Sequence, residues 1–158
     1  MSKADRTICE DIPGALDDVR AFYTDLANIK RVHPLVVAVR SVERSDTSDG
    51  YRQTYRVTDR IPLGPLHLRA SYIARLYVPR TGDVLTEARQ FPRVRLTGRV
   101  SFERAGAATR VTERIAIEAP RPLAPMTVRK AVEAHTEMLA AMRRLFEGGA
   151  NQRDYVGQ

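Results

Sequence analysis

The chain has 158 residues, of which 43% are hydrophobic and 28% charged, proportions that suit a single globular domain with its own core. The formal net charge is +7, and arginine carries most of it, because Lys3, Lys30 and Lys130 are the lysines. The sequence shows no apolar run of about 20 residues that could span a membrane, no apolar leader, and no partner for Cys9 in a disulfide. We therefore expect a cytoplasmic protein.

The first part of the chain predicts a strand followed by short helical structure. Residues 6–12 have the composition of a strand. Apolar residues then recur at a spacing of three to four from 15 to 32, which predicts one helix or two short ones, with a break near Asp25. His33-Pro34 ends this segment, because the residue before a proline is driven out of the helical conformation.

From residue 35 to residue 119 the hydrophobic period changes to two, which predicts a meander of hairpins. The expected strands cover residues 35–43, 51–61, 66–76, 84–90, 94–102 and 110–118. In the strands at 51–61, 66–76, 94–102 and 110–118, apolar residues gather on one face and arginines alternate onto the other. The pattern of residues 84–90 leaves the orientation of that strand open.

The longest predicted helix covers residues 125–147, with an apolar stripe along one face, and Gly148-Gly149 ends it. We expect one domain over residues 1–149, followed by a flexible tail at 150–158.

The order of elements predicts an α+β fold, in which a curved antiparallel sheet covers its apolar face with the late helix. Small and polar residues on the expected inner face indicate a gap beside that helix rather than a dry core. They are Ala70, Ala74 and Gly98, and Gln53, Tyr55, Asp59, Tyr72, Glu113 and His135.

Several local segments resemble the START-like, helix-grip (SRPBCC) superfamily, which includes Bet v 1-type proteins and the polyketide cyclase/dehydrase and lipid-transport group. The resemblance covers about residues 6–147. It rests on Val19–Leu26, the segment Ile29-Lys30-Arg31-Val32-His33-Pro34, Thr109–Glu113 and Ala134–Leu139. It implies a seven-stranded sheet around the C-terminal helix, two short helices after the first strand and a deep hydrophobic cavity. Many relatives carry tryptophan before the His-Pro pair, where this chain has Val32.

His135, Glu113 and Tyr55 are the candidate catalytic residues. His135 lies on the apolar face of the long helix, where an imidazole could serve as a general acid or base, or could be a hydrogen-bonded core histidine. Glu113 points inward from the last strand, either to pair with that histidine or to reach solvent at the rim. Tyr55 and Tyr72 face inward on adjacent strands and could bind a ligand oxygen or simply pack.

The predicted ligand-binding residues share an inward position on a strand or on the long helix, or a place at the cavity mouth. They are His33, Tyr55, Val57, Leu68, Tyr72, Leu96, Val100, Glu113, Ile115, His135, Met138 and Met142. We expect no metal, since the histidines are scattered at 33, 67 and 135, and the sequence calls for no cofactor.

Ten arginines take outward positions on the strands and would decorate the convex face of the sheet. They are Arg52, Arg56, Arg60, Arg69, Arg75, Arg93, Arg95, Arg99, Arg110 and Arg114. This face is either a solvated, aggregation-resistant surface or a contact for an anionic surface or an acidic carrier protein. Nucleic acid is an unfavoured partner, because we expect no aromatic residues among these arginines for bases to stack on.

The leading interpretation is a binder of a hydrophobic small molecule, namely a lipid, isoprenoid, sterol or polyketide-like compound, acting as a monomer or homodimer. The alternative is a polyketide cyclase, aromatase or dehydratase that uses His135, Glu113 and a cavity tyrosine. A third is an interaction module that uses the arginine-rich face.

Overall fold

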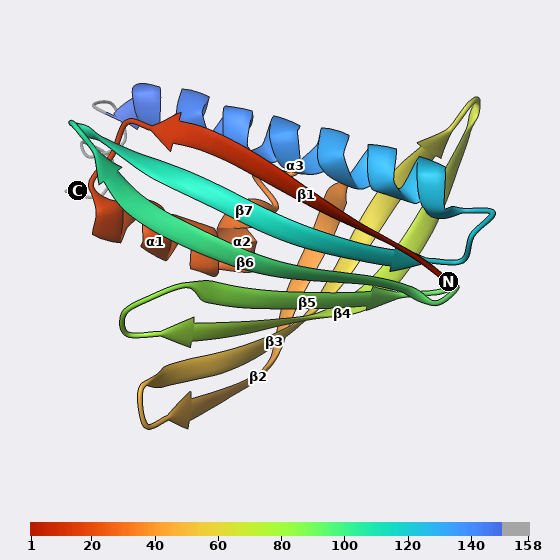
Figure 1. Ribbon diagram of the computed structural model, residues 1–158, viewed down its shortest axis with the longest axis horizontal. Coiled ribbons are helices and arrows are strands. Elements are labelled where there is room, and N and C mark those ends of the chain that lie inside the picture. Colours follow the sequence, from red (N-terminus) through yellow and green to blue (C-terminus); the bar gives the residue numbers. More distant parts are fainter. Residues whose placement is uncertain (150–158) are drawn as a thin grey trace.

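The computed structural model describes residues 1–149, a curved seven-stranded antiparallel sheet with one long helix lying along it (Figure 1). Two short helices follow the first strand. The expected helix-grip architecture is therefore confirmed. The tail predicted at residues 150–158 lies outside the described residues.

The strands follow one another as hairpins, except for the first. They are β1 (Ser2–Ile12), β2 (Val36–Thr47), β3 (Gly50–Leu63), β4 (Leu66–Pro79), β5 (Val84–Gln90), β6 (Val94–Ala105) and β7 (Ala108–Ala119). Their order across the sheet is β1-β7-β6-β5-β4-β3-β2, so the first strand pairs with the last. β1 starts at Ser2 rather than residue 6 because it pairs with the full length of β7, from Ser2 opposite Ala119 to Ile12 opposite Thr109.

The helices are α1 (Leu16–Thr24), α2 (Leu26–Ile29) and α3 (Ala124–Glu147). Asp25 separates the first two, as expected, and its carboxylate accepts a 3.0 Å hydrogen bond from the backbone N–H of Ala27. α3 packs mainly on β1 and also on β7. Its buried side chains include Met138, Leu139 and Met142.

The alternation read from the sequence matches the burial along β3 and β7. On β3, Gln53, Tyr55, Val57 and Asp59 are buried while Arg52, Arg56 and Arg60 are exposed. The undecided strand, β5, turns Thr86 and Ala88 inward, because Thr86 lies opposite Leu76 on β4 and Gly98 on β6.

Two expectations about the inner face are wrong. Leu68 takes an inward position, yet it is 52% exposed, because the β3–β4 hairpin extends beyond the core that would cover it. Gly98 does not open space in the interior either. A Cβ there would lie 2.4 Å from Thr86 Oγ1, so the threonine already fills that position.

Candidate functional site

A cavity of about 110 Å³ lies between the inner face of the sheet, α2 and α3. Its walls are mostly apolar and come from β2–β6 and the helices. The lining residues are Tyr23, Leu26, Ile29, His33, Val36, Val39, Val57, Tyr72, Ala74, Leu76, Thr86, Glu87, Ala88, Leu96, His135 and Met138. This is the kind of largely apolar space, with a few polar groups, in which proteins bind small molecules.

The most strongly buried polar contact at the cavity joins α3 to β7. His135 Nδ1 lies 2.6 Å from Glu113 Oε2, and the side chains are 18% and 1% exposed. This contact uses Nδ1, so Nε2 is the ring nitrogen left for a ligand. The second carboxylate oxygen, Glu113 Oε1, is buried without a hydrogen-bond partner in residues 1–149.

The pair determines the protonation of His135. Burial lowers the pKa of the imidazole, but the charge of Glu113, the hydrogen bond and a smaller contribution from Asp59 together raise this pKa above its usual value. Burial, followed by the nearby Glu113 carboxylate, also raises the pKa of Tyr23 on α1. The arrangement therefore favours an imidazolium beside a carboxylate, in a place that water reaches poorly.

A second polar pair lies on β3 and β4. The Tyr72 hydroxyl donates to Asp59 Oδ1 at 3.3 Å. Burial raises the pKa of Asp59 to about 6, even though the Tyr72 hydrogen bond and the charge of His135 act in the opposite direction. Asp59 is therefore a carboxyl group that can gain or lose a proton near neutral pH.

His33, just beyond α2, supplies a third titratable group. Its ring packs edge-on against that of His135, with centroids 5.8 Å apart. Burial, together with the charge of His135, lowers the pKa of His33 to about 3. Its Nδ1 accepts a 3.2 Å hydrogen bond from the backbone N–H of Leu35, so the neutral ring carries its proton on Nε2.

The structure brings six of the predicted binding residues to the cavity wall. They are His33, Val57, Tyr72, Leu96, His135 and Met138. Glu113 reaches the cavity through His135, whereas Tyr55, Val100, Ile115 and Met142 are buried in the surrounding core. The tyrosines that line the cavity are Tyr23 and Tyr72, not the candidate Tyr55. Asp59, which the alternation of β3 places on the inner face, is buried, although it was not among the predicted binding residues.

No protein-family model matches the sequence, and no curated protein matches it significantly. Solved structures do match. A protein from Thermus thermophilus aligns with a TM-score of 0.71 at 17% identity, covering 92% of this chain and 99% of that one. A START superfamily protein from Mycobacterium smegmatis aligns with a TM-score of 0.65 at 13% identity, covering 90% and 97%.

The di-domain ARO/CYC StfQ from the steffimycin biosynthetic pathway aligns with a TM-score of 0.73 at 13% identity. The match covers 94% of this chain and 52% of StfQ, so the chain spans about half of that protein. This chain has a START-like, helix-grip fold. At such low identities the likeness establishes the fold alone, and the activity has to be argued from the site.

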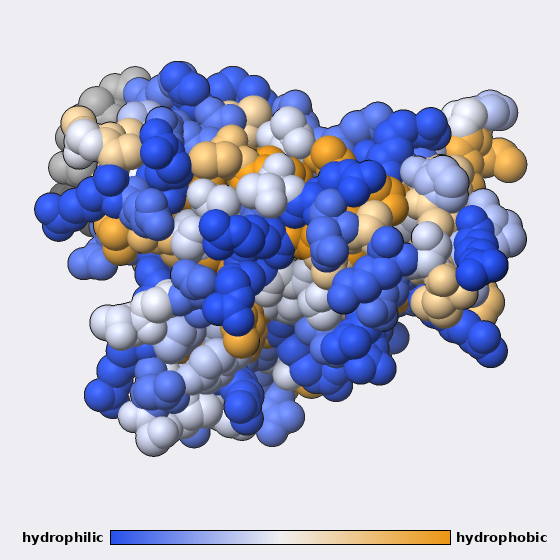
Figure 2. All heavy atoms as spheres, viewed as in Figure 1, coloured by the Kyte–Doolittle hydropathy of each residue, from blue (hydrophilic) through white to orange (hydrophobic). Residues whose placement is uncertain are grey.

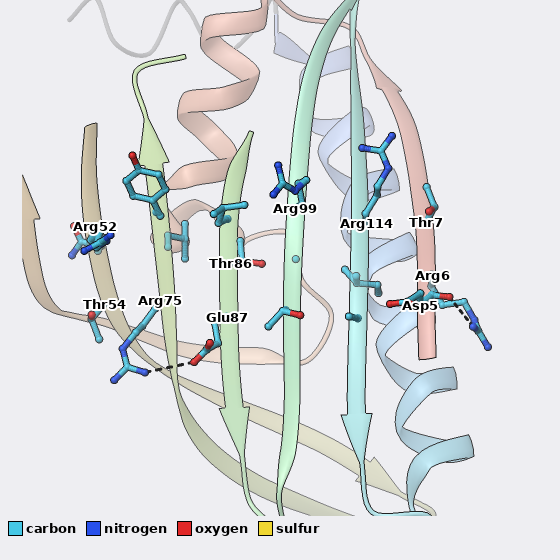
Figure 3. A pocket seen from close by; sticks show the side chains of 18 of the residues that line it. Asp5, Arg6, Thr7, Arg52, Thr54, Arg75, Thr86, Glu87, Arg99 and Arg114 are labelled. Carbon is cyan, nitrogen blue, oxygen red and sulfur yellow. Dashed lines mark hydrogen bonds and ion pairs between the residues drawn. The ribbon is translucent and has the colours of Figure 1, made fainter. Parts of the chain in front are cut away.

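The outer face of this START-like sheet is hollowed as well. A depression of about 820 Å³ crosses it, and Figure 3 shows arginines rising from the strands around it. Arg52, Arg99 and Arg114 come from β3, β6 and β7, and Arg75 from β4 lies 3.9 Å from Glu87. Glu87 also contacts Arg89 and Arg95, each at 2.9 Å, so one carboxylate holds three guanidinium groups.

An aromatic ring does lie among these arginines, so that part of the sequence prediction is wrong. Tyr77 on β4 is opposite Arg52 on β3, and the guanidinium lies 5.4 Å from the ring centroid. Side chains alternate along β4, and Leu76 points inward, so the next residue, Tyr77, lies on the outer face. The contact is a cation–π pair, which already occupies that ring.

Within residues 1–149 no group of three or more histidine, cysteine or acidic side chains is arranged to hold a metal ion. None of the described helices combines the length and the apolar character needed to cross a membrane.

Proposed function

We propose that the protein binds a hydrophobic small molecule, of the lipid, isoprenoid, sterol or polyketide class, in the cavity between the sheet and α3. The observation that carries this proposal is the polar end of an otherwise apolar cavity. There His135, held by buried Glu113, lies within electrostatic reach of the Asp59–Tyr72 pair. Such groups would bind a ligand oxygen while the apolar wall accepts the hydrocarbon.

The size of the cavity limits how a ligand enters. An apolar cavity of about 150 Å³ in another protein accommodates benzene. The space of about 110 Å³ here is smaller, so it suits at most a compact group in this conformation. A lipid or sterol therefore requires the wall to move, and Met138, an adaptable side chain of α3, lies in that wall.

Cavity occupancy can be tested by blocking the space. We expect native mass spectrometry and solvent extraction of the purified protein to reveal a bound apolar compound. Ala88→Leu, which adds carbon to the inner face of β5, should abolish that binding. The matched control is Ala116→Leu on the outer face of β7, which should retain the ligand. An empty wild-type protein that also fails to bind a panel of lipids, sterols and polyketides would reject the proposal.

A second candidate function is that of a cyclase or dehydratase acting on a polyketide-like substrate. It is favoured by the ionisable groups around the cavity and by the presence of an ARO/CYC protein among the structural neighbours. In this mechanism His135 Nε2 would take or give the proton at carbon, with Glu113 stabilising the imidazolium. Tyr72 and Asp59 would orient the substrate oxygen and exchange a proton with it.

The two candidates predict different behaviour of His135→Gln. If the protein is an enzyme, this variant should lose turnover of a polyketide-like substrate while its dissociation constant stays within a few-fold. Tyr72→Phe should weaken both binding and turnover. A carrier would show no turnover in the wild type, and His135→Gln would change only its affinity.

A further inference from the structure

The outer end of the β3–β4 hairpin has two different faces. Ile61 lies opposite Leu68 and Leu63 opposite Leu66, so these four aliphatic side chains share one face. The other face pairs Arg60 with Arg69 and Pro62 with His67. A two-residue turn, Gly64-Pro65, closes the hairpin, with glycine at φ 60°.

The apolar face of this tip has no cover within the described residues. Leu63, Leu66 and Leu68 are 42%, 72% and 52% exposed. α3 packs on β1 and β7, and the tip projects beyond the end of that helix (Figure 1). Figure 2 shows apolar surface at the same extremity of the molecule. Large side chains left in water on a protruding tip indicate a contact surface.

The charged side chains of the hairpin segment that forms the tip are all positive. From Arg60 to Arg80 the sequence contains no aspartate or glutamate, and Asp59 and Asp83 bracket the segment. Arg60 and Arg69 form no ion pair in the part of the chain that the structure describes. A partner of this tip should therefore offer an apolar interior to the leucines and negative charges at its surface to Arg60 and Arg69.

We propose that the β3–β4 hairpin tip inserts into the interface of a membrane that contains anionic lipids. The leucines enter the boundary of the acyl chains, and Arg60 and Arg69 bind the headgroup phosphates. A lipid bilayer suits this tip better than a protein, since a stable protein interface buries about 800 Å² on each partner and the end of one two-stranded hairpin is too narrow to supply that. This surface is separate from the cavity, so its test does not depend on the proposed function.

The absence of tryptophan from the sequence makes a direct test simple. In Leu66→Trp the introduced indole is the sole tryptophan, placed at the tip. We expect its fluorescence to shift to the blue, and to be quenched by brominated acyl chains, with vesicles of phosphatidylcholine plus phosphatidylserine. Leu85→Trp, at an exposed leucine on the outer face of β5, is the matched control and should show neither effect.

Unlabelled variants separate the two faces of the tip in a vesicle sedimentation assay. Leu63→Ser with Leu66→Ser should lower partitioning by about tenfold or more. Arg60→Gln with Arg69→Gln should lower it about 25-fold on anionic vesicles, roughly fivefold for each charge. Arg99→Gln with Arg114→Gln, which removes the same charge from the outer hollow, should change it much less.

Three results would overturn the proposal. The first is partitioning that does not respond to the leucine substitutions, and the second is an equal loss in the Arg99/Arg114 variant. The third is concentration-dependent self-association, measured by analytical ultracentrifugation, that the Leu63/Leu66 double variant abolishes. That last outcome would assign the tip to a second copy of this chain.

Discussion

Replacing Glu113 with glutamine tests whether the buried contact with His135 is an ion pair. The substitution keeps the length and shape of the side chain and removes its charge. Without that charge, the burial of His135 is no longer outweighed, because Glu113 is the main contribution that raises the pKa of the imidazole. The pKa of His135 should then fall below its ordinary value of about 6.5.

The expected cost follows from the geometry of the contact. A hydrogen bond to a charged group contributes about 1.5–3 kcal/mol to stability and a neutral one about 0.5–1.5 kcal/mol, so the loss is ~1–2 kcal/mol. For a chain of this length each kcal/mol corresponds to about 2–4 °C in Tm. The burial of both side chains means that solvent screens this contact little.

The sign of the pH dependence is the decisive part. The folded pKa of His135 is raised, so the stabilisation is complete below the unfolded pKa of about 6.5 and is lost as pH rises through the folded pKa. The stability gap between wild type and Glu113→Gln should therefore be large near pH 6 and smaller near pH 9.

Urea unfolding followed by circular dichroism at both pH values measures this gap, and NMR titration of the histidine Cε1–H signals measures the pKa itself. Asp11→Asn removes an exposed carboxylate that pairs with Arg110 at 2.9 Å and should leave the His135 titration unchanged. A gap that does not vary with pH, or a His135 signal that titrates as in wild type, would refute the ion pair.

Two other substitutions probe the interior. The pKa of Asp59 is raised to about 6, so its contribution to stability is lost as pH rises through that value, and Asp59→Asn should stabilise the protein by up to about 3 kcal/mol at pH 8 but hardly at pH 4. Equal unfolding curves for Asp59→Asn and wild type at pH 8 would contradict this. Gly98→Ala should cost about 1–3 kcal/mol in urea unfolding, since its Cβ meets Thr86 Oγ1, and adding Thr86→Ala should recover part of the loss. Wild-type stability of Gly98→Ala would show that the Thr86 side chain can change rotamer without cost.

Period-two alternation was enough to predict which residues face inward on β3 and β7. This alternation predicted the inward positions of Glu113 and Tyr72, and helical periodicity predicted that of His135. Alternation assigns a side chain to a face, however, and says nothing about what covers that face. Leu68 therefore has the predicted orientation and is nonetheless exposed, because its hairpin is longer than the layer packed against it.

The pairings at the site depend on contacts between distant segments, which local patterns do not encode. The contact between Asp59 and Tyr72 requires the register of β3 on β4, and that of Glu113 with His135 requires the placement of α3 over the sheet. The cavity volume could not be predicted from the sequence either, because it depends on how side chains such as Thr86 fill the space on the inner face of the sheet.

The pairing of β1 with β7 has a consequence for the order in which the chain is made. Cys9 and Thr112 are neighbours in the finished sheet but 103 residues apart in the chain, a distance that a ribosome covers in about 5–20 s. During that interval the nascent β1 segment lacks the strand with which it pairs, and its backbone N–H and C=O groups can bind chaperones or other chains. Completion of the sheet therefore waits for the last strand to emerge, and truncation before residue 108 should leave β1 without a native partner.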